Sequence, residues 1–264
     1  MVGVSTACLY PLETEKSLEL LVDKGVRLVE IFFNTYSEFN EPFIRNLKSV
    51  CDKNGVKVKS VHPFLSYAEP IMFFGNYERR KADGMAMYER YFEAAAMLGA
   101  EIFQFHGQKK EMYISAGEYA EVYSSLYNLA KKYNVIFSQE NVSRCLCGDP
   151  GYVSELSDIL GNDIRFTLDV KQANRWGCDP LRMAEAMKGK ISVVHINDYN
   201  DSHDCLLPCR GSYNLKKFAE YLNFCGYHSD YIIEVYAQDY KNIDEIITSE
   251  NNFRIITENI IKNK

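Results

Sequence analysis

Histidine and carboxylate side chains recur at the ends of short apolar segments along this 264-residue sequence. The segments are rich in β-branched and aromatic residues, which is typical of buried strands. The side chains at or near their ends are Glu30, His62, His106, Glu140, Asp169, His195 and Glu234. Inward-facing carboxylates on neighbouring strands repel one another and would need a positive charge among them. Carboxylate oxygens and neutral imidazole are common ligands of Mn²⁺, Zn²⁺, Co²⁺ and Mg²⁺, so the pattern predicts a divalent metal ion.

The elements that must position these residues alternate regularly between two patterns. Strand-like runs occur at 2–7, 27–33, 56–61, 101–106, 135–140, 164–169, 191–196 and 231–236. Helical periodicity occurs at 14–24, 38–53, 77–98, 115–133, 150–160, 179–188, 214–225 and 243–261. Eight strand–helix units in a chain of this length predict an α/β protein with a (β/α)₈ TIM barrel. A doubly wound sheet is disfavoured because no glycine-rich phosphate loop follows the first strand.

Composition and charge narrow the class of protein. The chain is 47% hydrophobic and 25% charged, with a net charge of −6. We find no linker and predict one TIM barrel domain over residues 1–264. The acidic balance makes a nucleic-acid partner unlikely, and no apolar run of about 18 residues predicts a membrane span. The N-terminus lacks the pattern of a secretory signal and the eight cysteines read as reduced thiols, so we expect a cytoplasmic protein.

The last four predicted strands carry the group with the clearest chemistry, Glu140, Asp169, His195 and Glu234. These strands are neighbours around half of the barrel, so the four side chains are predicted to hold one metal ion. Glu140 and Glu234 lie at the two ends of the arc and would approach a substrate from different sides. This arrangement suits a two-base proton transfer next to a carbonyl, with an enediolate whose negative charge the metal stabilises.

At these residues the sequence resembles the xylose isomerase-like (β/α)₈ superfamily, the group of sugar phosphate isomerases and epimerases. The resemblance covers essentially the whole chain and rests on the ordered phrases VEIFF, SVHPF, FQFHG, FSQEN, FTLDVKQA, VVHINDYN, LLPCRGSYN and YIIEVY. Similarity to the ketose 3-epimerases implies that Glu140 and Glu234 are both metal ligands and the acid/base pair. It also implies that Asp169 and His195 complete the metal site. The sequence departs from those epimerases at Gln172, where they have a histidine, and at Asp201, where they have an arginine.

Further side chains are predicted to contact a small sugar or cyclitol substrate. They are Glu30, His62, His106, Lys171, Gln172, Trp176, Asn197, His203 and Arg210. Each also has a simpler interpretation. Glu30 could pair with His62 or His106, or be a buried structural carboxylate. Trp176 could pack within its loop, and Arg210 could form a surface ion pair. Lys109 and Lys110 are interpreted as solvated loop charges.

Three other functions remain open at this point. The same metal site suits an inosose dehydratase-type lyase. An abasic-site endonuclease-like zinc enzyme would use His62, His106 and the Asp-Ser-His element at 201–203 for additional zinc ions. A barrel that binds sugar without catalysis is the third possibility.

The segment at 63–76 carries aromatic residues. Tyr67, Phe73 and Phe74 predict either a hydrophobic lid or a contact in a homo-oligomer. The cysteine pairs at 145/147 and 205/209 are taken as free thiols.

Overall fold

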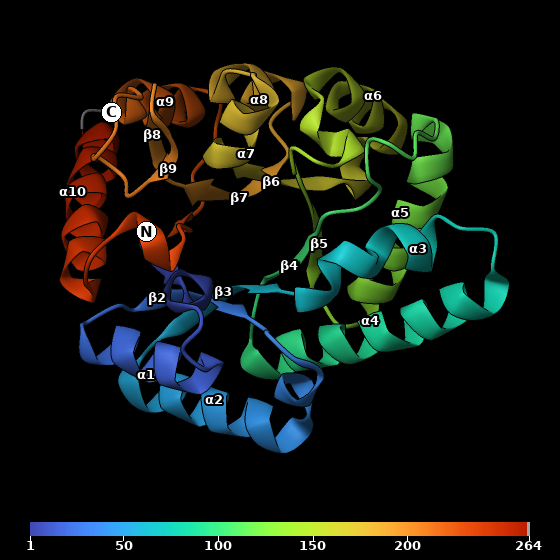
Figure 1. Cartoon of the computed structure of the whole chain (residues 1–264), viewed down its shortest axis with the longest axis horizontal. Helices are drawn as coiled ribbons and strands as arrows, with labels where there is room; N and C mark the ends of the chain where they lie inside the picture. Colours follow the sequence, from blue (N-terminus) through green and yellow to red (C-terminus); the bar gives the residue numbers. More distant parts are fainter. Residues whose placement is uncertain (263–264) are drawn as a thin grey trace.

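The computed structural model describes residues 1–262 of the chain. Within them, eight parallel strands close into a barrel with helices around it (Figure 1). The strands are β1 (Val2–Ser5), β2 (Leu28–Phe32), β3 (Lys57–His62), β4 (Ile102–Phe105), β5 (Ile136–Glu140), β6 (Arg165–Asp169), β7 (Ile191–Ile196) and β10 (Tyr231–Ile233). β1 pairs with β2 on one side and with β10 on the other, and this closes the ring. The predicted (β/α)₈ fold is confirmed.

A helix packs outside the barrel after each strand. These helices are α1 (Thr14–Asp23), α2 (Glu41–Asn54), α4 (Glu78–Leu98), α5 (Ala116–Lys132), α6 (Pro150–Leu160), α8 (Pro180–Ala186), α9 (Leu215–Phe224) and α10 (Ile243–Lys262). Local sequence explains several of their ends. Ser115 and Glu118 form a capping box at the start of α5, and Asp179 caps α8 ahead of a proline. Gly99 takes the left-handed conformation that ends α4.

Several short elements lie on the loops and were not predicted. They are α3 (Glu69–Phe73), α7 (Val170–Trp176), the hairpin of β8 (Asp198–Asn200) and β9 (His203–Leu206), and the 3-10 turns η1 (Thr6–Leu9), η2 (Tyr36–Phe39), η3 (Phe64–Ala68), η4 (Leu146–Gly148), η5 (Gly161–Asp163) and η6 (Ala237–Asp239). The predicted first and last strands are too long. β1 ends at Ser5 because its side chain caps η1, and β10 ends at Ile233.

The inside of the barrel is built in layers. Side chains two residues apart on a strand point the same way, so each strand contributes to successive layers. A small apolar layer near the bottom consists of Leu28, Ile102, Val193 and Ile232. Two residues further along the same four strands stand Glu30, Gln104, His195 and Glu234. A polar layer of side chains therefore packs directly on this apolar layer inside the barrel.

The aromatic segment after β3 is only partly a surface feature. Phe73 is buried and packs against Tyr88, whereas Tyr67 is 64% exposed. The buried ring anchors the segment to the outer helices. Among residues 1–262, no helix has both the length and the apolar character that crossing a membrane requires.

Candidate metal and catalytic site

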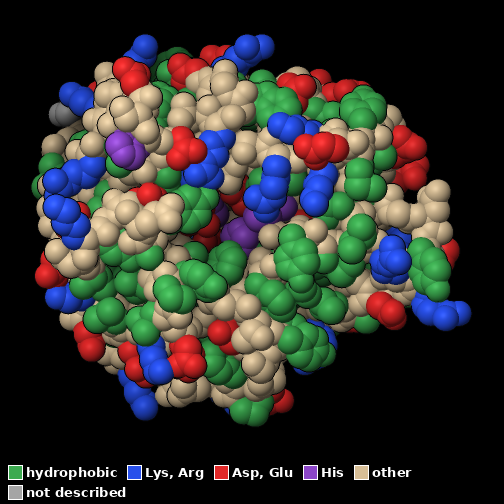
Figure 2. Space-filling model, in the orientation of Figure 1, with side chains coloured by type: hydrophobic (Ala, Val, Ile, Leu, Met, Phe, Trp, Pro, Cys, Tyr) green, Lys and Arg blue, Asp and Glu red, His purple; other side chains and the backbone are tan. Residues whose placement is uncertain are grey.

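Four predicted side chains converge at the carboxyl ends of β5, β6, β7 and β10. One ligand atom from each of Glu140, Asp169, His195 and Glu234 lies within 4.8 Å of those of the other three. His195 Nδ1 is 4.0 Å from Glu140 Oε1, 3.9 Å from Asp169 Oδ2 and 3.4 Å from Glu234 Oε2. Figure 2 shows histidine side chains at the base of a central hollow on this face. The geometry is that of a group able to hold one metal ion.

Several polar atoms of this cluster are buried with few partners. His195 Nδ1 has no hydrogen-bond partner, and Asp169 Oδ2 has only the ammonium group of Lys171, at 2.9 Å. A buried polar atom left unpaired costs about 1–3 kcal/mol, and more when it is charged. The open lone pair of His195 Nδ1, with three carboxylates beside it, is one that a divalent cation would bind, and carboxylate and imidazole are suitable donors. The residues present therefore fit a metal ion.

Glu30 lies behind His195 and orients its ring. Glu30 Oε2 is 3.1 Å from His195 Nε2 and also accepts a hydrogen bond from Ser60 Oγ at 2.6 Å. A carboxylate at Nε2 keeps the hydrogen on that nitrogen and leaves the Nδ1 lone pair facing the cluster. Glu30 is fully buried, and its carboxylate pairs with His195 and not with His62 or His106, the two histidines expected from the sequence.

The pKa shifts of His195 and Asp169 also indicate that this site favours a positive charge. Burial alone would lower the pKa of His195, but the carboxylates of Glu30 and Glu234 raise it well above the ordinary value. Burial raises the pKa of Asp169 to about 6, although the ammonium group of Lys171 opposes this shift. The site thus stabilises a cation and penalises additional negative charge.

Lys171 enters the cluster from the first turn of α7. Its Nζ lies 2.9 Å from Asp169 Oδ2 and 2.7 Å from Glu234 Oε2. Burial works to lower the pKa of Lys171, but those two carboxylates raise it well above the ordinary value. The ammonium group shares two carboxylates with the predicted metal position and is a resident cation of the site.

His62 and His106 form a second group around Glu140. His106 Nε2 is 2.9 Å from Glu140 Oε2 and 3.0 Å from His62 Nε2. The guanidinium group of Arg144 lies 3.3 Å from His106 Nδ1. A guanidinium group can only donate, so Nδ1 accepts and the hydrogen of the neutral ring is on Nε2. His106 therefore presents a donor to Glu140 and not the lone pair that a second metal ion would need.

The remaining predicted substrate residues differ in position. Asn197 Nδ2 donates to Asp169 Oδ1 at 3.3 Å and so lies in the cluster. Gln172 Oε1 accepts hydrogen bonds from Ser143 N at 3.0 Å and Ser143 Oγ at 2.8 Å, and its carbonyl is thus already engaged. Trp176 ends α7 half-buried, with Lys110 Nζ 5.0 Å from its ring centroid.

His203 and Arg210 are the two predicted residues that lie outside the cluster. Both are exposed, on β9 and in the loop that follows it. In the described chain, no hydrogen bond or ion pair joins either side chain to the four-residue group. Their predicted contact with substrate has no support from geometry.

Sequence reasoning missed three residues that shape the site. Gln104 Nε2 donates to Glu30 Oε2 at 3.3 Å, and Arg144 contacts His106 as described above. Glu69, buried on α3, accepts from the N–H groups of His106 at 2.9 Å and Gly107 at 2.6 Å. Gln104 stands two residues before His106 on an inward-facing register, a signal that was available from strand alternation. Glu69 carries no comparable signal because its partners come from other elements.

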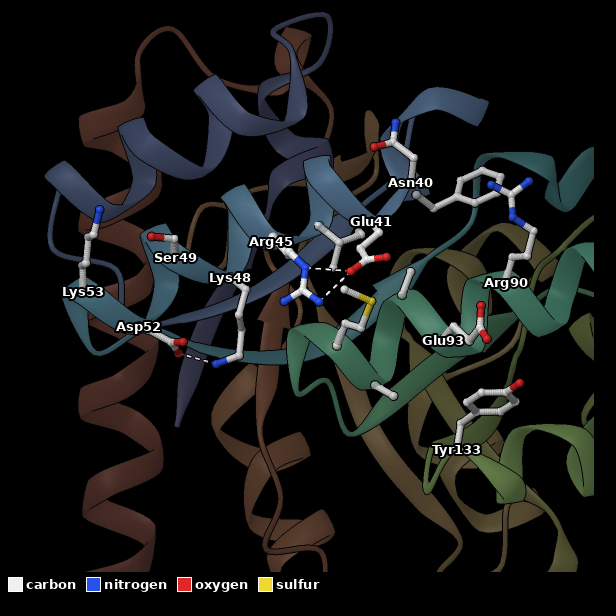
Figure 3. Close-up of a pocket in the computed structure, with 15 residues that line it drawn as sticks. Asn40, Glu41, Arg45, Lys48, Ser49, Asp52, Lys53, Arg90, Glu93 and Tyr133 are labelled. Carbon is white, nitrogen blue, oxygen red and sulfur yellow. Dashed lines mark hydrogen bonds and ion pairs between the residues drawn. The ribbon is translucent and has the colours of Figure 1, made fainter.

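Another hollow lies between α2 and α4 on the outside of the barrel (Figure 3). Its volume is about 910 Å³, and two of the basic side chains that line it are paired with carboxylates of their own helix. Arg45 pairs with Glu41 at 2.6 Å, and Lys48 pairs with Asp52. This groove contains no cluster of unpartnered acidic and imidazole groups comparable with the barrel site among residues 1–262.

The closed barrel and its acidic–imidazole cluster define an α/β barrel protein with a candidate metal centre at the carboxyl ends of its strands. Residues 18–254 match the family described as xylose isomerase-like TIM barrel, and the chain belongs to that family.

Solved structures of similar fold cover nearly the whole chain. A D-tagatose 3-epimerase-like protein has a TM-score of 0.82 at 21% identity, covering 99% of this chain and 98% of that one. The D-psicose 3-epimerase of Clostridium cellulolyticum H10, solved with D-tagatose, has a TM-score of 0.78 at 13% identity, covering 98% of both chains. The IolI protein with a bound zinc atom has a TM-score of 0.79 at 17% identity, also covering 98% of both. An uncharacterised protein of Mycobacterium leprae is 24% identical over 92% of this chain and 91% of its own length.

Proposed function

We propose that this protein is a metal-dependent sugar isomerase or epimerase, which moves a proton next to a carbonyl of a small polyhydroxylated substrate. The observation that carries the proposal is the pair of carboxylates on either side of His195 Nδ1. Glu140 approaches it from β5 at 4.0 Å and Glu234 from the end of β10 at 3.4 Å. The similar solved proteins, which include sugar 3-epimerases and one with a bound zinc atom, support the same class.

The two glutamates are the base and the acid. One carboxylate removes the proton from the carbon beside the carbonyl, and the other returns a proton to the opposite face or to the adjacent carbon. Burial alone would raise the pKa of Glu140, but the neighbouring His106 and His62 hold it well below the ordinary range. Burial would likewise raise the pKa of Glu234, but the positive charges of Lys171 and His195 hold it well below the ordinary range. Both groups are therefore ionised at neutral pH and able to accept a proton.

The metal ligands are Glu140, Asp169, His195 and Glu234. A divalent ion bound there, Mn²⁺, Zn²⁺, Co²⁺ or Mg²⁺, supplies a Lewis acid that polarises the carbonyl and stabilises the enediolate charge. The chain's own groups complete the pocket. Lys171 brings a second positive charge to the same carboxylates, and Asn197 holds Asp169 in place.

The test is solvent exchange. The Mn²⁺-loaded protein is incubated with ketoses and inososes in D₂O, and deuterium on carbon is measured by mass spectrometry or NMR. We expect exchange in the wild type, and its loss in Glu140→Gln and Glu234→Gln with the fold unchanged by circular dichroism. Full exchange in both variants would reject the mechanism. Product analysis separates isomerisation and epimerisation from dehydration, which releases water and leaves a lighter product.

A second candidate, hydrolysis at abasic DNA sites, is favoured by one observation. His62, His106 and Glu140 form a second group that could hold a metal ion. The donor hydrogen that Arg144 imposes on His106 Nε2 opposes it, as does the net charge of −6. Metal content and a nicking assay decide between the two candidates. A nuclease of this kind should bind more than one zinc ion per chain and should nick a DNA duplex that contains an abasic site.

A further inference from the structure

Two basic side chains are placed directly opposite each other at the mouth of the pocket. The loop after β4 and the loop after β5 run antiparallel there, with Lys109 and Cys145 forming a β-bridge. The N–H of Lys110 donates to the carbonyl of Arg144 at 3.2 Å, which fixes the register. In an antiparallel pair, directly opposed residues extend their side chains on the same side, about 5 Å apart at Cβ. Lys110 and Arg144 therefore share one face of the bridge.

This arrangement is unfavourable unless something negative lies between the two side chains. Like charges directly opposite each other destabilise an antiparallel pair. Both side chains are exposed, and neither forms an ion pair with a carboxylate in the described chain. Each of the two side chains instead contacts an aromatic ring. Arg144 reaches His106 Nδ1 at 3.3 Å, and Lys110 Nζ lies 5.0 Å from the centroid of Trp176.

Several other basic side chains of the protein are paired with nearby carboxylates. In the groove between α2 and α4, Arg45 and Lys48 each pair with an acidic residue four positions away (Figure 3). Arg175, which also lies on the catalytic face, pairs with Asp204 at 2.5 Å. Lys110 and Arg144 have no such carboxylate although they face each other on paired backbone, and unfavourable local arrangements of this kind tend to persist where they serve a ligand.

We infer that Lys110 and Arg144 bind an anionic oxyacid group, a phosphate or a carboxylate, carried by the substrate. The inference rests on the proposed function, since it places this group on the molecule whose proton is moved. The planar guanidinium group forms two parallel hydrogen bonds with such an anion, and the lysine ammonium adds a point charge. Figure 2 shows Lys and Arg side chains bordering the hollow that has histidine at its base.

The position of the pair relative to the cluster suits a small substrate. Arg144 contacts one nitrogen of His106, and the other nitrogen of the same ring is 2.9 Å from Glu140 Oε2. The imidazole ring of His106 therefore lies between the inferred anion site and the carboxylate of Glu140, the proposed acid/base group. A sugar chain of a few carbons spans that separation, with its anionic group at the rim and its carbonyl at the metal ligands.

The experiment measures binding separately from turnover. Inorganic phosphate is titrated calorimetrically into Mn²⁺-loaded protein, and fructose, fructose 6-phosphate and glucuronate are compared in the same way. The test variant is the double change Lys110→Gln/Arg144→Gln. The matched control is Lys131→Gln/Lys132→Gln, which removes two exposed positive charges at the C-terminal end of α5. Lys131 Nζ also lies over an aromatic ring, 5.7 Å from the centroid of Tyr127, as Lys110 does over Trp176.

We expect the wild type and the control to bind phosphate and at least one of the two anionic sugars more tightly than fructose. The test variant should lose about tenfold or more in that affinity, because charge-assisted hydrogen bonds are removed. The tighter of fructose 6-phosphate and glucuronate identifies the anion. Equal affinities in the test variant and the wild type would overturn the inference, and so would an equal loss in the control.

The outcome also separates this inference from the proposed function. If phosphate binding depends on Lys110 and Arg144 but no sugar exchanges deuterium, the inferred anion site is supported and the proposed proton transfer is rejected. If deuterium exchange occurs and neither exchange nor phosphate binding differs between the wild type and Lys110→Gln/Arg144→Gln, proton transfer is supported and the anion site is rejected.

Discussion

Glu69 offers a change whose effect on stability can be worked out from the structure. Its carboxylate is fully buried and accepts three hydrogen bonds, from Tyr88 Oη at 2.5 Å and from the N–H groups of His106 and Gly107. It thereby holds α3, and the segment that follows β3, against the loop that carries His106. Glu69→Gln keeps the shape of this contact. Its amide oxygen accepts from the two N–H groups, while its NH₂ donates to the tyrosine oxygen.

The magnitude follows from the pKa. Burial raises the pKa of Glu69 from 4.5 to about 8, even though its three hydrogen bonds act in the other direction. The folded protein thus prefers the neutral acid, and the stability that this preference contributes is complete below pH 4.5. It is lost as the pH rises through about 8, because the unfolded chain ionises first. The full window corresponds to about 5 kcal/mol, at 1.36 kcal/mol for each pH unit.

The assay is urea unfolding of the wild type and Glu69→Gln at pH 5 and pH 8.5. We expect the two free energies of unfolding to be similar at pH 5 and the glutamine variant to be more stable at pH 8.5, by about 3–5 kcal/mol. Glu101→Gln is the control. Burial raises the pKa of Glu101, but Lys57 and Lys59 lower it overall, so the stability that its charge contributes is already complete above its unfolded pKa of 4.5. The difference between the wild type and Glu101→Gln should therefore stay constant from pH 5 to pH 8.5 and shrink only below pH 4.5. A difference between wild type and Glu69→Gln that stays constant from pH 5 to pH 8.5 would show that the burial argument is wrong.

Three further changes test the site and its support. Lys171→Met removes a cation that competes for two ligand carboxylates, so calorimetry should show Mn²⁺ binding about tenfold tighter or more; weaker binding would contradict the competition. Glu30→Gln removes the anionic acceptor at His195 Nε2 and should weaken Mn²⁺ binding about 10–100-fold, whereas unchanged affinity would mean that the ring is oriented by other contacts. Gly107→Ala should cost about 2–4 kcal/mol in thermal or urea unfolding, because φ is +82° and the new Cβ would stand 1.7 Å from Tyr119 Oη. Adding Tyr119→Phe should recover part of that loss, and no recovery would place the strain in the backbone alone.

Much of the fold could be predicted from periodicity. Apolar runs with strand character and amphipathic stretches alternate from one end of the chain to the other, and the parallel barrel is the closed arrangement that such a pattern favours. The short helices and strands on the loops were not predicted, because they are too short to show a periodic pattern of apolar residues. α7 is an example, since it begins directly after Asp169 and is started by that residue's side chain, which accepts from Gln172 N at 3.1 Å.

The residues that meet at the barrel centre could be named from the order of the strands alone. Parallel strands put all their carboxyl ends on one face, so Glu140, Asp169, His195 and Glu234 had to come close once the barrel closed. The roles proposed for them stay predictions until exchange and metal binding are measured.

The atoms that face each other could be identified only from the three-dimensional arrangement of the strands and loops. Glu30 and His195 are 165 residues apart and belong to strands that are not neighbours in the ring, yet they touch across its interior. Lys110 was interpreted as a solvated charge, and it is exposed, but its opposition to Arg144 depends on the pairing of two separate loops. Periodicity describes which way a side chain points from its own element, whereas partners across the barrel depend on register and side-chain conformation, which a local pattern does not contain.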